Sequence, residues 1–443
     1  MPQLNSQICL LPTEILYTIL RAVLDEIVEC DMMISPKPEH ELLPGGLSFP
    51  HTMALVCRYW RDVVFSAPVL WTRIFCVLPA SGSTVEQMLS YQLEKTGILP
   101  VDLTIVSKKV YPLYDIVLRC IGPHIGRLRS LRISNLSSSL SHVNNDIITL
   151  PSYAPWLECL QLDTRLNKLL EINCPMLRTL HVNVVVAMTI DPQWLNNLTH
   201  VESITISLGY SLACGYEAIR ALGAIPRRIP SLTLDFSFPS YPYRHNPAFK
   251  IGAEKVIIHG LAALLNVIDD HCKTVVLREC NIDSGTHILP YSSTLLELDR
   301  CISSNLFGEL TWKWGGDTVI ITSSDYGCIQ TILTRLNPPQ ASLNNSRELH
   351  LWSRVTTLKL VANGKFKMNF SVSLLRSVVY RRFTWDDAMR KIVENDEKPG
   401  NGEFKCVEPI RVLHVHGGPP LSRHMRSWFK KHVEDFVWDY KRS

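Results

Sequence analysis

Histidine and cysteine side chains form two short clusters whose types and spacing could support chemistry. His414 and His416 alternate along one predicted strand, so both imidazoles would lie on the same face, as two metal ligands can. No third ligand is evident nearby, and ordinary strand histidines are the simpler interpretation. His271 and Cys272 are adjacent, and adjacent strand residues point to opposite faces, which would separate the thiol from its base.

Two carboxylate pairs, Asp269-Asp270 and Asp386-Asp387, have low specificity and are explained by solvation at helix ends or in loops. The chain contains no phosphate-binding loop, dinucleotide fingerprint, zinc-protease helix or nucleophile elbow. We therefore expect no catalytic residue, no metal site and no cofactor. An enzyme with an unrecognised site is the least favoured alternative.

Cationic and aromatic residues alternate late in the chain, in the order Arg376, Tyr380, Arg381, Arg382, Phe383 and Trp385. Such interleaving can contact nucleic acid or an acidic peptide. A solvated edge of the fold is the favoured interpretation.

Composition indicates an ordered chain. Hydrophobic residues make up 46% of the 443 residues and charged residues 19%, and the net charge of +4 gives no argument for nucleic acid or an anionic membrane as partner. No apolar run is long enough to span a bilayer, and the N-terminus lacks the pattern of a signal peptide. The 13 cysteines include no CxxC pair, which favours reduced thiols and a cytoplasmic or nuclear location.

Two apolar segments near the N-terminus have helical spacing. Pro12 suits the first turn of a helix, where its missing N–H has no partner to lose, and Pro68 is expected to end the second helix. The stripes are Ile15, Leu16, Ile19, Leu20 and Val23 on the first helix, and Met53, Val56, Cys57, Trp60 and Val64 on the second. Such short helices bury little apolar surface, so some side chains should remain available to a partner. Periodicity alone is also compatible with an ordinary helical core.

The ordered motifs in these segments resemble an F-box, the docking module of ubiquitin-ligase receptors. The matching stretches are Leu11–Leu16 (LPTEIL), Leu55–Asp62 (LVCRYWRD) and Pro68–Ile74 (PVLWTRI). The resemblance implies a helical module at residues 8–78 that binds a Skp-type adaptor and, through it, a cullin. The adaptor-binding residues that it implies are Leu11, Pro12, Ile15, Leu16, Ile19, Leu55, Val56, Trp60, Leu70 and Trp71. An insertion at about residues 29–50, rich in proline and glycine, predicts a surface loop between the first two helices.

The rest of the chain repeats an apolar-x-x-apolar-x-apolar unit at steps of about 20–30 residues, the spacing of leucine-rich repeats. Clear units are Leu128/Leu131/Ile133, Leu157/Leu160/Leu162, Leu177/Leu180/Val182, Val201/Ile204/Ile206, Ile229/Leu232/Leu234, Ala253/Val256/Ile258, Cys272/Val275/Leu277, Val355/Leu358/Leu360 and Ile410/Leu413/Val415. Weaker ones are Leu295/Leu298, Val319/Ile321 and Leu375/Val378. Short helices are predicted at residues 218–222 and 260–268.

We therefore predict an α/β fold in which a small helical F-box precedes an irregular leucine-rich-repeat-like solenoid with parallel strands. An ordinary α/β domain with leucine-rich strands remains the alternative. Residues 79–125 would form a helical linker and an N-terminal cap, with a helix from Thr84 to Thr96 and the capping segment Tyr111–Leu118, and residues 126–420 the solenoid. Residues 421–443 would form an amphipathic helix that caps the C-terminal end or, alternatively, binds a partner.

An F-box followed by irregular repeats resembles the large F-box families of mushroom-forming fungi. The resemblance implies the substrate-recognition subunit of an SCF-type E3 ubiquitin ligase, with transfer chemistry left to partner enzymes. A protein substrate would lie on the outward strand residues Arg132, Gln161, His181, Thr205, Thr233, Arg278 and Lys359, and neither nucleic acid nor membrane is an expected partner. The alternative is a non-catalytic scaffold without a role in ubiquitylation.

Overall fold

A computed structural model describes residues 11–33, 50–78, 83–107, 117, 119–135, 153–163, 172–184, 192–208, 219–236, 249–260, 262–281, 289–290, 292–303, 314–337, 352–362, 368–394 and 407–440. The chain forms two compact units. The first unit comprises Met1–Glu202 and Ser211–Ala218, and the second comprises Ser203–Tyr210 and Ile219–Ser443.

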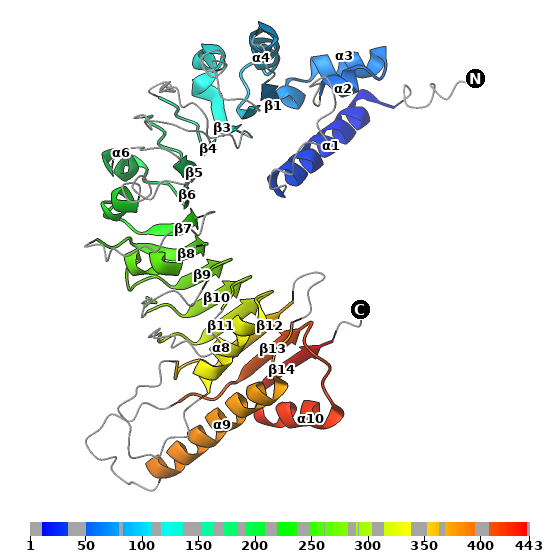
Figure 1. The fold of residues 1–443 in the computed structure, drawn as a ribbon. Coiled ribbons are helices and arrows are strands. Elements are labelled where there is room, and N and C mark those ends of the chain that lie inside the picture. Colours follow the sequence, from blue (N-terminus) through cyan, green and yellow to red (C-terminus); the bar gives the residue numbers. More distant parts are fainter. Residues whose placement is uncertain are drawn as a thin grey trace, which may run out of the picture. The chain divides into compact units, whose positions relative to one another are not determined.

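The fold is α/β, with an open sheet of 14 strands that follow one another in sequence order (Figure 1). Every strand pair whose register is described is parallel, as in β1–β2 and β13–β14. The strands are β1 (Arg73–Leu78), β2 (Val101–Ser107), β3 (Leu128–Asn135), β4 (Cys159–Asp163), β5 (Thr179–Val184), β6 (Ser203–Leu208), β7 (Ile229–Phe236), β8 (Ala253–His259), β9 (Thr274–Arg278), β10 (Leu295–Asp299), β11 (Thr318–Thr322), β12 (Thr357–Val361), β13 (Val412–His416) and β14 (Asp435–Asp439).

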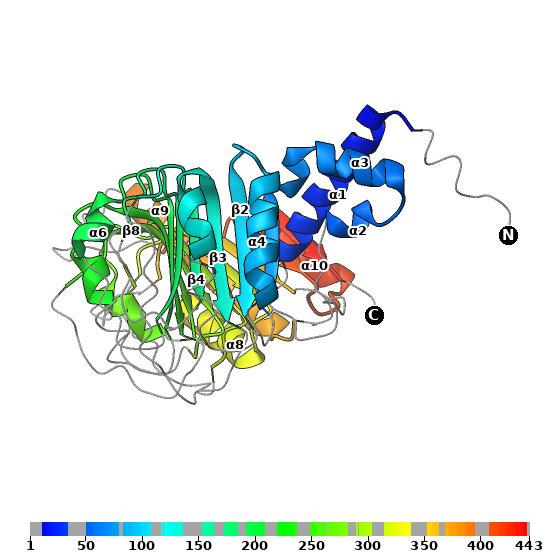
Figure 2. The ribbon, with the colours of Figure 1, turned by 90° about the horizontal axis from the view of Figure 1, so that it is seen from above.

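The first unit begins with helices. They are α1 (Thr13–Met33), α2 (His51–Ala54), α3 (Arg58–Ser66) and the 3-10 turn η2 (Pro68–Trp71). The Sγ of Cys57 caps α3 by accepting a hydrogen bond from the N–H of Trp60 at 3.4 Å, and Pro68 starts η2 directly after α3. Helix α4 (Ser83–Lys95) lies against η2 and β1 (Figure 2), and η3 (Gly122–Arg127) and α6 (Pro192–Asn197) connect later strands.

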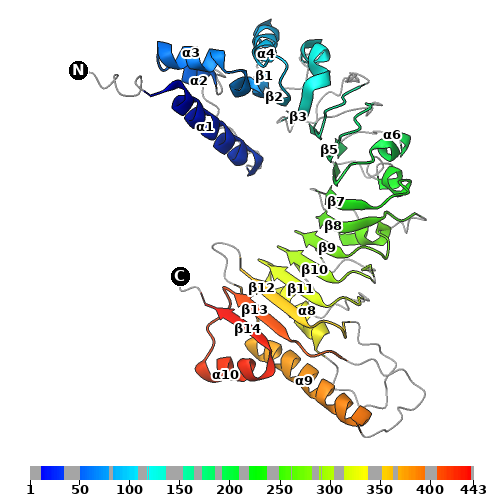
Figure 3. The same cartoon turned by 180° about the vertical axis from the view of Figure 1, so that it is seen from behind.

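In the second unit, longer helices follow the later strands. These elements are η4 (Ala262–Val267), α8 (Tyr326–Leu336), α9 (Val372–Glu394) and α10 (Arg423–His432). Helices α9 and α10 lie side by side, and α10 also contacts β14 (Figures 1 and 3). Asp325 and Ser422 cap α8 and α10 by accepting hydrogen bonds from the N–H groups of Cys328 and Met425.

The apolar repeat positions form the core. In β12, Leu358 and Leu360 are fully buried and align with Leu413 and Val415 of β13. The same inward pair occurs in β3 as Leu131 and Ile133. Since alternate strand residues share a face, each strand adds one pair to a continuous apolar layer.

Each strand from β8 to β11, and also β13, is followed by a residue in the left-handed region. These residues are Gly260, Glu279, Arg300, Ser323 and Gly417, with φ between 47° and 83°. The N–H of Glu279 donates to the carbonyl of Asp299 at 2.8 Å, and the N–H of Arg300 donates to Thr322 in the same way. Gly260 has no substitute, because a Cβ there would lie 2.0 Å from the Phe236 carbonyl oxygen.

A ladder of small polar side chains then closes the turns. Cys280, Cys301 and Ser324 are each three residues after the last inward apolar residue of their strand. Each side chain donates to a carbonyl of the preceding strand, as in Cys280 to Ile258 (3.5 Å), Cys301 to Leu277 (3.3 Å) and Ser324 to Leu298 (3.2 Å). The ladder thereby links each turn to the backbone of the preceding strand.

The predicted domain boundaries are wrong at both ends of the sheet. The sheet begins with β1 inside the segment assigned to the helical module, and β2 lies within the predicted linker and cap at 79–125. At the C-terminal end, the predicted helix at 421–443 stops at His432, and β14 pairs with β13. The triplet Val433, Phe436 and Trp438 repeats the inward pattern of the other strands, so burial of Trp438 against the sheet favours a strand.

Two of the predicted repeat units do not match the observed strand positions. Leu375 and Val378 lie in α9 and not in a strand, because a spacing of three residues also places two side chains on one helix face. In β10 the buried pair is Leu296 and Leu298, whereas Leu295 is only half-buried. The remaining predicted units from β3 to β13 coincide with observed strands.

Among the shorter predictions, the helix at 218–222 is observed at residues 219–223, and the one at 260–268 is the 3-10 turn η4. The predicted insertion begins too early, because residues 29–33 belong to α1. Its residues 34–49 lie outside the described part of the chain, as does most of the capping segment at 111–118.

Candidate functional site

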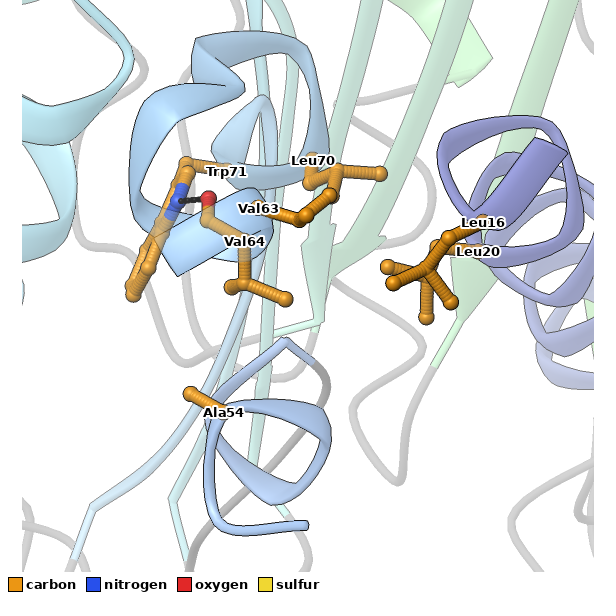
Figure 4. Packing of buried hydrophobic residues seen from close by; sticks show 7 residues of the cluster. All are labelled: Leu16, Leu20, Ala54, Val63, Val64, Leu70 and Trp71. Carbon is orange, nitrogen blue, oxygen red and sulfur yellow. Dashed lines mark hydrogen bonds between the residues drawn. The ribbon is translucent and has the colours of Figure 1, made fainter. Parts of the chain in front are cut away.

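The N-terminal helices enclose a small apolar core of their own. Leu16 and Leu20 extend from α1 toward Val63 and Leu70 (Figure 4), and the full buried set is Leu16, Leu20, Ala54, Val63, Val64, Leu70 and Trp71. The indole Nε1 of Trp71 donates to the Val64 carbonyl at 2.9 Å, which satisfies the polar atom of this large buried ring. These helices therefore form a packed module.

Polar contacts connect the two predicted halves of this module. The hydroxyl of Tyr59 in α3 donates to the Leu11 carbonyl at 2.7 Å and lies 3.2 Å from the hydroxyl of Thr13. The Nε of Arg61 donates to the Ala54 carbonyl at 3.2 Å. The chain before α1 is thereby held against α3.

The residues predicted to bind an adaptor separate into a core group and a surface group. Leu16, Leu70 and Trp71 are buried in the module, and Leu11 and Trp60 are half-buried. Pro12 is exposed, and the apolar side chains of Ile15, Ile19, Leu55 and Val56 are 48%, 43%, 63% and 56% exposed. Ile15 and Ile19 are one turn apart on α1, so they share an outward face. We call Pro12, Ile15, Ile19, Leu55 and Val56 the exposed apolar set.

Trp60 adds an unusual detail to this surface. Its Nε1 is buried yet has no hydrogen-bond partner among the described residues. A buried indole N–H without an acceptor is unfavourable, and an acceptor supplied by a partner would relieve that cost.

A cavity of about 860 Å³ lies on another side of the module. Its lining includes Tyr17 from α1, Val69 from η2 and Ile98 from the turn before β2. Ile98 is 94% exposed. Among the described lining residues, Glu14 is the one carboxylate, and no histidine or cysteine accompanies it.

The outward strand residues of the first unit form one row. Arg132, Gln161 and His181 occupy equivalent positions of β3, β4 and β5, and Thr104 of β2 continues the row. All four side chains are half-buried. The structure therefore brings together the three predicted substrate residues of this unit.

In the second unit the corresponding row is polar at its two ends and largely apolar in the middle. Thr205 and Thr233 align in β6 and β7, and Lys359 aligns with His414 near the other end. Between them the row consists of Ile257, Val276, Glu297 and Ile320. Val276 is buried, so the middle of this row is largely apolar.

Arg278 does not belong to this row. It aligns with His259 of β8 and Asp299 of β10, two residues farther along the strands. The prediction placed Arg278 among the outward strand residues with Lys359, but the strand register puts Arg278 two residues farther along the strands than the row that contains Lys359.

The row containing Arg278 carries a cluster of ionisable groups that the sequence did not reveal. His259 places its Nδ1 2.6 Å from Asp235 and its Nε2 2.7 Å from Glu279. Arg300 forms an ion pair with Glu279, and Arg278 lies 3.8 Å from Asp299. These groups come from four different strands or strand ends, so only the register brings them together.

The pKa values in this cluster shift in opposite directions. Burial acts to lower the pKa of His259, but its hydrogen bonds to Asp235 and Glu279 outweigh burial and raise it. The hydrogen bond from His259, with the charge of Arg300, lowers the pKa of Glu279. The imidazolium between two carboxylates is thus a structural ion pair network.

The other candidate clusters have structural explanations. His414 and His416 lie 2.8 Å from Asp435 and Asp439 of the neighbouring strand, so each imidazole has its own carboxylate. His271 is exposed and Cys272 is buried, as expected for residues on opposite faces. Within the described residues, no group of three histidine, cysteine or acidic side chains could hold a metal ion.

The cationic and aromatic residues between Arg376 and Trp385 lie in α9, and they divide into buried and exposed residues. Arg382 is 1% exposed, and its guanidinium donates to the carbonyls of Leu336, Trp352, Ser353, Val355 and Glu408 at 2.7–3.4 Å. Burial lowers its pKa to about 10, which still leaves it cationic at neutral pH. Arg376, Tyr380 and Phe383 instead face α10.

Comparison with protein-family models, with curated proteins and with solved structures finds no match to this chain. None of the described helices has the length and apolar character needed to cross a bilayer.

Proposed function

We propose that this chain is the substrate-recognition subunit of an SCF-type E3 ubiquitin ligase. The observation that carries the proposal is the exposed apolar set on a helical module with a closed core. Leu55 and Val56 are more than half exposed, although the module has its own apolar interior. Ile15 and Ile19 share one face of α1, and Leu55 and Val56 are adjacent in the chain, so these exposed apolar side chains occur in groups, which is typical of a protein-binding surface.

The three motif stretches support an F-box as the identity of this module. The residues of these stretches serve two roles: Leu16, Leu70 and Trp71 close the core, while Pro12, Ile15 and Leu55 are exposed. A Skp-type adaptor would cover the outward residues and connect the chain to a cullin. The unpartnered Nε1 of Trp60 offers the adaptor a hydrogen-bond donor.

The sheet supports a leucine-rich-repeat-like solenoid as the finer description of the fold. Strands in sequence order, all described pairs parallel, are the arrangement that such repeats produce. The ladder of Cys280, Cys301 and Ser324 occupies the position where the repeat pattern carries asparagine or cysteine. In these three turns, two thiols and a hydroxyl make the hydrogen bonds to the preceding strand.

In this proposal the strand face of the sheet binds a protein substrate and performs no chemistry. Ubiquitin transfer is accelerated because the substrate lysine is held close to the charged conjugating enzyme. The strand-face residues Arg132, Gln161, His181, Thr205, Thr233 and Lys359 are candidates for that contact, and Arg278 contributes from its separate row.

The test is capture of a purified Skp-type adaptor and cullin by the full chain. Leu55→Asp introduces a charge at the most exposed large apolar side chain of the set, and we expect it to weaken capture by tenfold or more, about the effect of losing one interface anchor. Ile302→Asp, a similarly exposed apolar position in the second unit, is the matched control and should capture normally. Equal capture by both variants would refute the proposal.

A further inference from the structure

Helices α9 and α10 meet along a seam of aromatic and cationic side chains. Trp428 and His432 of α10 stack with ring centroids 4.1 Å apart, and Phe383 of α9 meets His432 edge-on at 5.2 Å. Tyr380 lies 6.4 Å from Trp428, and the guanidinium of Arg376 lies over the Trp428 ring at 5.0 Å. We call Arg376, Tyr380, Phe383, Trp428 and His432 the α9–α10 seam.

The seam remains open on its outer side. Tyr380 and Phe383 are 52% and 42% exposed, although both are large and apolar. Phe429 and Trp438, by contrast, are buried behind the seam and complete the core beneath α10. The exposed rings are therefore not needed to close the interior.

The solvent side of α10 is strongly cationic. The helix has the sequence RHMRSWFKKH, which contains no acidic residue, and Arg423, Arg426, Lys430 and Lys431 are all exposed. Among the described residues, none of these cations forms an ion pair. The nearest carboxylates along the chain are Glu434 and Asp435, and Asp435 lies beside His414. The helix dipole stabilises positive charge in the last turn of α10, but it does not stabilise Arg423 in the first turn.

We propose that the α9–α10 seam with the cations of α10 binds an acidic peptide segment that carries an apolar side chain. The carboxylates of the segment would meet Arg423, Arg426, Lys430 and Lys431. Its apolar side chain would pack on the exposed edges of Tyr380 and Phe383. Helical periodicity places Lys431 nearest to Trp428 and His432, and it places Arg423, Arg426 and Lys430 on the opposite side of α10. The segment would therefore cross over α10, with its apolar side chain at the seam and its carboxylates on the cations.

The ring packing favours a peptide over single-stranded nucleic acid. Nucleic acid binding of this kind depends on aromatic faces that are free to stack with bases. Here the ring of Trp428 is already covered by His432 and Arg376. Tyr380 and Phe383 also contact rings of α10, so they are only partly open, and a small part of an apolar ring suits an aliphatic or aromatic side chain.

The inference rests on the proposed function in one respect, namely that the acidic segment would belong to a ubiquitylation substrate. Binding itself can be measured without an adaptor. The two proposals therefore fail separately: loss of adaptor capture would overturn the first, and loss of peptide binding would overturn the second.

The experiment uses fluorescence anisotropy with the full chain. The probe is a labelled peptide of glutamate and aspartate with one central phenylalanine, and a labelled oligothymidylate of equal charge serves as the nucleic acid arm. We expect the peptide to bind more tightly than the oligothymidylate and its affinity to fall as salt is raised, because exposed charges are screened. Lys430→Glu with Lys431→Glu should weaken peptide binding by about tenfold or more, and Tyr380→Ala should weaken it several-fold.

A matched control reverses the same amount of charge elsewhere in the second unit. Arg228→Glu with Lys255→Glu changes two exposed cations that form no described ion pair, and it should leave peptide binding within about twofold. Thermal unfolding and adaptor capture of both double variants should match the unmodified chain. Absent or salt-insensitive peptide binding, tighter binding of the oligothymidylate, or an equal loss in the control would overturn the inference. If the Lys430/Lys431 variant does not fold, the salt titration and the Tyr380 variant still decide it.

Discussion

The phenol hydroxyl of Tyr59 donates a hydrogen bond of 2.7 Å to the backbone carbonyl of Leu11, 48 residues earlier in the chain. This contact joins the first motif stretch to the second across a segment that contains all of α1 and α2. It holds Leu11 and Pro12 in place at the start of α1. The backbone position of Pro12, which belongs to the exposed apolar set, therefore depends on the Tyr59 side chain of α3.

Replacing Tyr59 with phenylalanine removes only this hydroxyl. We expect Tyr59→Phe to destabilise the helical module by about 1 kcal/mol, the usual net value of one hydrogen bond, and to weaken adaptor capture modestly. Differential scanning fluorimetry and adaptor titration would measure the two effects. Tyr91→Phe, which alters an exposed hydroxyl on α4, is the control and should change neither quantity. Unchanged stability in Tyr59→Phe would show that the contact does not fix the start of α1.

Arg382 supports the C-terminal part of the second unit. Its guanidinium joins α9 to five carbonyls from the α8 end, the turn before β12 and the segment that precedes β13. Lysine carries the same charge but cannot form this forked set of hydrogen bonds, so Arg382→Lys should cost about 3 kcal/mol or more. Urea unfolding followed by circular dichroism would measure the loss. Arg354→Lys, at an exposed position, should be neutral; a similarly neutral Arg382→Lys would contradict the assigned role.

His259 makes the stability of the second unit depend on pH. Because its folded pKa is raised above the ordinary value of 6.5, its contribution is fully present below pH 6.5 and is lost as pH rises through the folded pKa. Glu279 acts in the opposite direction: its pKa is lowered from 4.5, so its contribution is lost as pH falls through the folded value. The His259 term should be at most about 1 kcal/mol, since the partners are partly exposed.

Melting temperatures across the neutral range would test this titration. We expect the unmodified chain to lose stability as pH rises above 6.5, and His259→Gln to lose that dependence while keeping a hydrogen-bonding side chain. His271→Gln is a suitable control, because His271 is exposed and outside the cluster. A pH dependence that survives in His259→Gln would assign it to other groups.

Sequence alone located most of the strands and the helical module. Inward pairs such as Leu131/Ile133 and Ile204/Ile206 are recognisable because side-chain alternation in a strand is a local property of the chain. The stripe with Leu16 and Leu20 is local in the same sense. What the stripe could not show was which apolar residues would be covered, since Leu16 is buried and Ile15, its neighbour, is exposed.

Tertiary structure decided whatever depends on partners distant in sequence. Leu375 and Val378 fit a helix or a repeat unit equally well by spacing, and packing selected the helix. Phe436 and Trp438 became part of a strand because β13 offered an edge to pair with. Register separated Arg278 from Lys359 and brought His259 between Asp235 and Glu279, and helix packing buried Arg382 while leaving Tyr380 exposed. None of these outcomes has a local signal, because each depends on hydrogen bonds and burial that form only when separate segments meet.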